Sequence, residues 1–284
     1  MQRLLTAAVA TPLAILALFY LPPAGWFVLI ALFLEFAVWE YLVIVRAQAP
    51  HAPLKALLLF VPLAAVAMSA AMIPNAGPNA GGLDAETYLL IAATLISLGL
   101  GSLVLFSRTP LEEAIPALGI LCFGIPYFAV PIASLYALKR LDPWLVFLLM
   151  AIVWLGDTAA FYVGSKIGRH KLAPVISPKK SWEGAAAGFV TSAAAAAVWS
   201  VCRLGRLDLA LLGVAALTAL AAQVGDLVES MIKRGAGVKD SGHVLPGHGG
   251  VLDRMDAMLF AAPVLLIGFW LLRIEGIPSL FLGR

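Results

Sequence analysis

Long apolar segments, each close to the length that crosses a bilayer, recur along almost the whole chain. The hydrocarbon core of a membrane needs about 20 consecutive apolar residues per helix. With 62% hydrophobic and 12% charged residues, the chain is too apolar for a soluble fold. We therefore expect an all-α polytopic membrane protein with about nine transmembrane helices, at roughly residues 4–21, 25–44, 54–73, 87–106, 114–138, 144–163, 185–202, 207–233 and 252–272.

The two parts of the chain differ in polarity, although we expect them to form one membrane domain. Residues 1–143 hold five predicted spans with few polar groups, and residues 144–284 hold four spans with most of the polar chemistry. The first apolar run lacks a cleavage site and leads at once into a second, so we expect a transmembrane helix and not a cleaved signal. Pro126 and Pro131 predict that the fifth span is kinked or broken.

The lysine and arginine residues predict an orientation, because they favour the cytoplasmic side of a membrane. With a cytoplasmic N-terminus, the polar segments 164–184 and 235–250 also face the cytoplasm, and we expect the active site there. Of the 19 basic residues, six then lie outside: Lys139, Arg140, Arg203, Arg206, Arg273 and Arg284. The net charge of +3 is too small to indicate a nucleic-acid partner.

Four carboxylates flank the second polar segment. Asp226 and Glu229 lie near the end of the eighth span, and their i, i+3 spacing places both on one helix face. Asp253 and Asp256 open the ninth span at the same spacing. Because a short link joins these spans, we expect them to be antiparallel neighbours. Carboxylates gathered at the membrane edge predict a Mg²⁺ site, since this ion prefers oxygen ligands.

A purely structural interpretation of these carboxylates remains open. Asp253 stands at a helix start, where it would serve as an N-cap. Glu229 and Lys233 have the i, i+4 spacing of a simple ion pair.

The segment 235–250 is rich in glycine and carries nearby cations, which is typical of a phosphate-binding loop. It does not match the nucleotide-binding P-loop pattern, and no strand is expected before it. His248 is a candidate general acid or base, or a structural donor in a tight turn.

Here the chain resembles a known family. The residues Ser230 to Arg234, Lys239 to Ser241 and Leu245 to Asp256 resemble the signature of phosphatidate cytidylyltransferases. The resemblance implies a multi-span helical enzyme that uses Mg²⁺, CTP and phosphatidate, with a second, monovalent cation such as K⁺ and a homodimer. It extends to Asp157 and to the stretch Ile176 to Gly184, although Phe161 and Ala257 depart from the usual pattern.

The resemblance and the residue chemistry together assign roles. We expect Mg²⁺ at Asp226, Asp253 and Asp256, with Glu229 as a ligand or a neighbour of the ion. The other expected catalytic residues are Lys233, Arg234, Lys239, Asp240 and His248. The expected substrate-binding residues are Lys179, Lys180, Ser181, Ser230, Ser241, Gly249, Gly250 and Arg254. We assign Lys166, Arg169 and Lys171 to anionic lipid headgroups instead.

The implied reaction transfers a cytidylyl group from CTP to phosphatidate at the inner membrane of the cell. A CTP-dependent enzyme acting on an isoprenoid lipid, such as a CDP-archaeol synthase or polyprenol kinase, is the nearest alternative. A cation-coupled transporter is an alternative of another class, because buried carboxylates also mark ion paths. That alternative predicts polar residues near the membrane midplane, whereas here they gather in loops at one face.

Overall fold

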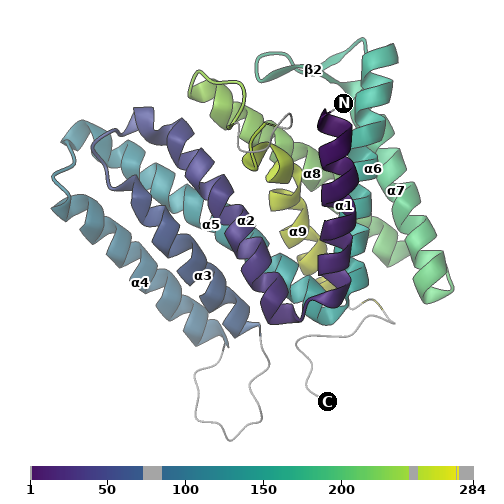
Figure 1. The fold of residues 1–284 in the computed structure, drawn as a ribbon, viewed down its shortest axis with the longest axis horizontal. Coiled ribbons are helices and arrows are strands. Elements are labelled where there is room, and N and C mark those ends of the chain that lie inside the picture. The colour runs from purple at the N-terminus through teal and green to yellow at the C-terminus, as the bar shows by residue number, and fades with distance from the viewer. Residues whose placement is uncertain (1, 73–84, 243–248, 273, 275–284) are drawn as a thin grey trace, which may run out of the picture.

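The fold was analysed in a computed structural model, which describes residues 2–72, 85–242, 249–272 and 274. The described residues form nine α-helices, two short 3-10 helices and one small hairpin (Figure 1). The helices are α1 (Gln2–Tyr20), α2 (Pro23–Val45), α3 (Leu57–Ala71), α4 (Ala85–Phe106), α5 (Leu111–Leu141), α6 (Pro143–Ile167), α7 (Trp182–Leu204), α8 (Leu209–Gly235) and α9 (Leu252–Leu272).

These helices coincide with the nine spans expected from the sequence, and the chain is an all-α polytopic membrane protein. Among the described residues, eight helices, α2 to α9, are long and apolar enough to cross a membrane, and Thr11–Tyr20 of α1 is a shorter apolar segment. The fifth span, expected to be kinked or broken, is not broken: α5 runs without interruption through Pro116, Pro126 and Pro131. A transmembrane helix can contain such prolines, because neighbouring helices and polar side chains satisfy the backbone groups that each proline leaves unpaired.

Short polar side chains fix where several helices begin. Asp142 accepts the N–H of Trp144 at 2.9 Å, and Asp208 accepts that of Leu211 at 3.0 Å. Ser181 caps α7, since its hydroxyl accepts the N–H of Gly184 at 3.2 Å. Each cap satisfies a backbone donor that has no partner inside its own helix.

A β-hairpin connects α6 to α7, where the sequence predicted only a polar segment. Strands β1 (Lys171–Ala173) and β2 (Ser177–Ser181) pair antiparallel, with an irregular register between Lys171 and Ala173. His170 and Glu183 close its base, with Nδ1 and Oε1 2.7 Å apart. The hairpin therefore holds β2 directly ahead of α7.

The helices are arranged so that α3 and α4 lie at one end of the molecule and α7 at the other (Figure 1). Both α2 and α5 pack against α9, which joins the two parts of the chain. Fully buried side chains such as Leu34, Phe128 and Leu149 fill the interior. Large apolar residues such as Leu105 and Ile115 are exposed, as expected for a surface that lipid covers.

Lys139 lies at the end of the bundle opposite the hairpin, and it is buried. Its Nζ donates to the carbonyl of Leu18 in the last turn of α1 and stands 5.2 Å from the ring centroid of Trp26. A cation at a helix C-terminus is stabilised by the helix dipole. This contact explains why a lysine is found on the predicted outer side, where basic residues are otherwise disfavoured.

Candidate functional site

The candidate site lies where α8 ends and α9 begins, at the same end of the bundle as the hairpin and the start of α1 (Figure 1). The two helices are packed neighbours, as predicted. They approach closely at Gly225, where an added Cβ would lie 2.6 Å from the carbonyl oxygen of Asp256. The missing side chain therefore brings Asp226, the next residue, close to the first turns of α9.

Lys233 bridges the two helices. Its Nζ lies 2.7 Å from Oε2 of Glu229 and 2.6 Å from Oδ1 of Asp253. The side chain of Glu229 is 1% exposed, and those of Lys233 and Asp253 are 12% and 13% exposed. The ion pair expected between Glu229 and Lys233 is present, but it belongs to a larger buried network. Charges removed from water need such partners.

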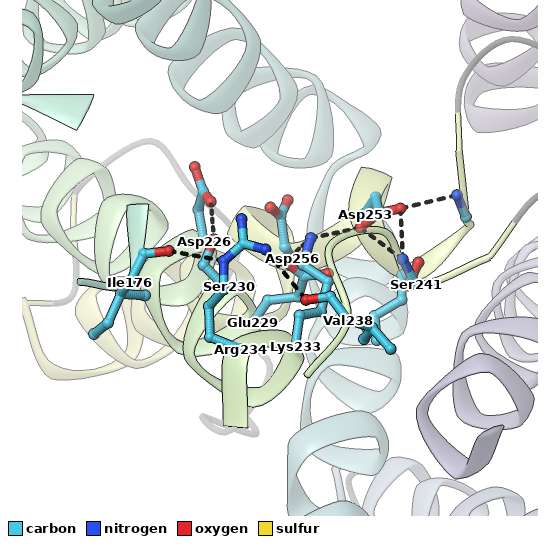
Figure 2. Close-up of polar contacts among 12 residues, drawn as sticks. Ile176, Asp226, Glu229, Ser230, Lys233, Arg234, Val238, Ser241, Asp253 and Asp256 are labelled. Atoms are coloured by element: carbon cyan, nitrogen blue, oxygen red, sulfur yellow. Dashed lines mark hydrogen bonds and ion pairs between the residues drawn. The ribbon is translucent and has the colours of Figure 1, made fainter. Parts of the chain in front are cut away.

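Asp253 also holds the glycine-rich loop. Its Oδ2 accepts the N–H of Ser241 at 3.1 Å and the N–H of Gly250 at 2.9 Å. Hydrogen bonds to an ionised carboxylate are about twice as strong as neutral ones. Figure 2 shows these bonds on one side of the site. We call Glu229, Lys233, Ser241, Gly250 and Asp253 the loop side.

Asp226 and Asp256 form the other part of the site. Oδ2 of Asp226 pairs with Nζ of Lys180 from β2 at 2.5 Å, and the hydroxyl of Ser230 donates to Oδ1 at 3.5 Å. Oδ1 of Asp256 accepts the N–H of Ala257 at 2.7 Å. Figure 2 shows the carboxylates of Asp226 and Asp256 away from the loop bonds of Asp253. We call Lys180, Asp226, Ser230 and Asp256 the hairpin side.

Acidic side chains are concentrated around Asp256. The carboxylate of Asp256 interacts electrostatically with those of Asp226, Glu229 and Asp157. Oε1 of Glu229 is buried and has no hydrogen-bond partner among the described residues. Several carboxylates with one unpaired oxygen are a hard donor set that suits a divalent cation.

The carboxylates do not form a complete metal site by themselves. Within the described residues, no group of three or more His, Cys, Asp or Glu side chains is arranged to hold a metal ion. Mg²⁺ commonly binds one or two carboxylates together with water and substrate phosphates. Asp226 and Asp256 fit that arrangement, with Glu229 beside them. Asp253, also predicted as a ligand, is occupied by Lys233 and the loop N–H groups.

The hairpin supplies the cations that the sequence assigned to nucleotide binding. Lys180 reaches Asp226, whereas Lys179 is exposed at the surface. Ser181 is buried, and its hydroxyl is engaged as the α7 cap. Arg234 ties the hairpin to α8, because its Nε donates to the carbonyl of Ile176 at 3.3 Å.

The remaining predicted residues lie around this core. Lys239, Asp240 and Arg254 are exposed on the loop and the first turn of α9. Gly249 adopts a φ of 79°, a left-handed conformation that favours glycine. His248 lies outside the described residues, so its predicted role is not tested.

Glu40 of α2 reaches the site although no sequence motif contains it. Its Oε2 accepts the N–H of Leu252 at 2.8 Å and the hydroxyl of Ser241 at 3.1 Å. The only sequence signal was an acidic residue inside a long apolar span, which is costly unless it has a partner.

Comparisons with known proteins agree with the resemblance read from the sequence. A model of the cytidylyltransferase family matches residues 1–272. A phosphatidate cytidylyltransferase of Staphylococcus haemolyticus is 35% identical over 205 residues, which cover 72% of this chain and 76% of that protein. Phosphatidate cytidylyltransferases of Staphylococcus aureus and Bacillus subtilis are 48% and 43% identical over 121 residues, 41% and 42% of this chain. In these two comparisons the chain spans 45% of the relative's length.

Proposed function

The chain belongs to the cytidylyltransferase family, and from that membership we propose that it transfers a cytidylyl group from CTP to phosphatidate. The products are CDP-diacylglycerol and pyrophosphate. The observation that carries the proposal is the acidic pair Asp226 and Asp256, which lies beside a glycine-rich loop and the Lys180 cation at one end of a membrane-spanning bundle. A lipid phosphate whose acyl chains stay in the bilayer reaches such a site.

The reaction joins two anions. A phosphate oxygen of phosphatidate attacks the α-phosphorus of CTP, the new P–O bond forms, and the bond to the leaving pyrophosphate breaks. The attacking oxygen is already anionic, so no separate base is required. The site must therefore offset charge repulsion and hold the phosphates in line. We assign Lys179 and Lys180 on β2 to the CTP phosphates, and the exposed Lys239 to the lipid phosphate or the leaving group.

Mg²⁺ is the proposed cofactor, with Asp226 and Asp256 as its protein ligands and Glu229 next to them. When bound, it supplies positive charge that stabilises the transferring phosphoryl group. Lys180 pairs with Asp226, so its ammonium group lies beside the carboxylate that would hold the ion. On the loop side, Asp253 keeps the loop in place through Ser241 and Gly250. A second, monovalent cation such as K⁺ is part of the proposal only through the family resemblance, as is a homodimer.

We place the site at the cytoplasmic face of the inner membrane, with the N-terminus on the same side. Most basic residues lie at that end of the bundle, which agrees with the positive-inside tendency. Lys139, the main exception, is buried against α1.

The decisive experiment measures pyrophosphate release by the purified protein in lipid micelles with CTP and Mg²⁺. We expect release only when phosphatidate is added, together with a lipid product that carries cytidine. Parallel reactions contain a polyprenyl phosphate or no lipid acceptor. Pyrophosphate release with the polyprenyl phosphate but not with phosphatidate would show that the acceptor is an isoprenoid lipid. No pyrophosphate release with any acceptor would contradict the proposed transfer.

A further inference from the structure

A buried carboxylate from the N-terminal part of the chain anchors the candidate site. Glu40 lies in α2 and is 0% exposed. Its Oε2 accepts the hydroxyl of Ser241 and the N–H of Leu252, which are 201 and 212 residues away in the sequence. Both partners are buried. These two bonds connect α2 to the loop and to the first residue of α9.

The bond to Leu252 satisfies a helix terminus. The first N–H groups of a helix have no acceptor within it, and leaving one unpaired in an apolar interior costs free energy. A negative charge is also favourable at the positive end of the helix dipole. Glu40 therefore acts as a cap for α9 that is supplied by another helix.

Two glycines of the loop fit against the same carboxylate. An added Cβ at Gly242 would lie 2.5 Å from Oε1 of Glu40, and one at Gly250 would collide with Oε2 and with the Ser241 hydroxyl. The loop backbone thus approaches Glu40 as closely as glycine allows. Oε1 has no hydrogen-bond partner among the described residues.

Glu40 and Asp253 contact the same two loop residues, Ser241 and Gly250. Ser241 donates its hydroxyl to Glu40 and its N–H to Asp253. Gly250 contacts Glu40 and donates its N–H to Asp253. Through Asp253, the same chain of contacts continues to Lys233 and Glu229. A displacement of Glu40 would therefore move the residues that fix Asp253.

We propose that Glu40 is a positioning residue of the site: it fixes the glycine-rich loop on the N-terminus of α9 and so sets the place of Asp253. This inference rests on the proposed cytidylyl transfer for its effect on rate, but its structural part does not. Glu40 touches no reacting atom. It makes the N-terminal helices part of the catalytic architecture.

The test compares Glu40→Gln and Glu40→Ala with Glu35→Gln, which removes from the same helix a carboxylate that forms no hydrogen bond or ion pair with the described loop residues. Amide hydrogen exchange of residues 238–242 and 249–254 and thermal melting are measured together with turnover. We expect Glu40→Ala to lower kcat by about 10- to 100-fold, the usual effect of losing a group that orients a reacting side chain. Glu40→Gln keeps one acceptor and should lose less.

Coupling to the loop distinguishes positioning from general stabilisation. Glu40→Ala combined with Ser241→Ala should lower kcat by less than the product of the two single effects, because each change breaks the same contact between the two side chains. Exchange should rise in the loop and at Leu252, and stay unchanged in α6 and α7. Equal kcat in Glu40→Ala and Glu35→Gln, or faster exchange across the whole protein, would overturn the proposal. If the unmodified protein shows no cytidylyl transfer, the proposed function fails, and the exchange data alone still decide the role of Glu40.

Discussion

The loop side and the hairpin side each contain an aspartate from the predicted metal site, Asp253 and Asp226, but the two carboxylates have different partners. On the loop side, Asp253 is bonded to Lys233 and to two backbone N–H groups, and its side chain is 13% exposed. On the hairpin side, Asp226 pairs with Lys180 and is 30% exposed. A carboxylate held by several fixed donors is part of the scaffold. Asp226 is held by a flexible lysine and by a long 3.5 Å contact from the Ser230 hydroxyl, so it can exchange ligands readily. We infer that the hairpin side carries the changing charges of the reaction and that the loop side keeps its geometry.

The largest expected effect is that of Asp226→Asn. If the hairpin side holds the cation, this change should lower turnover by about 10²- to 10³-fold, as loss of one electrostatic stabiliser of a transition state does. The free energy of unfolding should change by only about 0–1 kcal/mol, because a partly exposed ion pair contributes little. Product formation at saturating CTP and chemical denaturation measure the two quantities. Turnover close to that of the unmodified protein would remove Asp226 from the proposed site.

Compared with Asp226→Asn, Asp253→Asn should have a smaller effect on turnover and a larger effect on the free energy of unfolding. We expect a loss of about 10- to 100-fold in rate, because the loop loses its anchor. The protein should also lose about 1–3 kcal/mol of stability, since Lys233 and two N–H groups lose a charged acceptor. The same two assays apply. Near-normal turnover would exclude both the anchor and the ligand role of Asp253, and unchanged stability with a large rate loss would place it with the hairpin side.

Gly250→Ala tests the loop side without changing a charge. The new Cβ would collide with the Ser241 hydroxyl and the Glu40 carboxylate, so we expect destabilisation of about 1–3 kcal/mol from overpacking. Gly235→Ala is the matched control, because a Cβ there meets no atom within 4 Å. Thermal melting of both variants compares them directly. Equal melting temperatures would mean that the loop is not packed tightly against Glu40.

The sequence predicted the helices well because lipid imposes their length and apolarity. It also predicted the pairing of α8 with α9, since only a short segment joins the two helices. It did not separate Asp253 from Asp226, because i, i+3 spacing fixes a helix face but not the partners that cross to it. The hairpin β1–β2 was missed, as its strands are short and lack an alternating pattern. The role of Glu40 depends on contacts more than 200 residues apart, which no local pattern encodes.

The smallest expected effect concerns the exposed cations of the hairpin. Lys179 on β2 precedes Lys180, which pairs with Asp226, whereas Lys171 lies on β1. If β2 faces the nucleotide, Lys179→Ala should raise the KM for CTP by about two- to fivefold, in line with an exposed charge contact of about 0.2–1 kcal/mol. Lys171→Ala should leave that KM unchanged, since Lys171 is assigned to anionic lipid headgroups. Initial rates over a range of CTP concentrations separate the two variants. An equal rise of the KM for CTP in both variants would show that the hairpin attracts CTP through its overall charge. Lys180 would then be the only hairpin lysine with a specific place in the site.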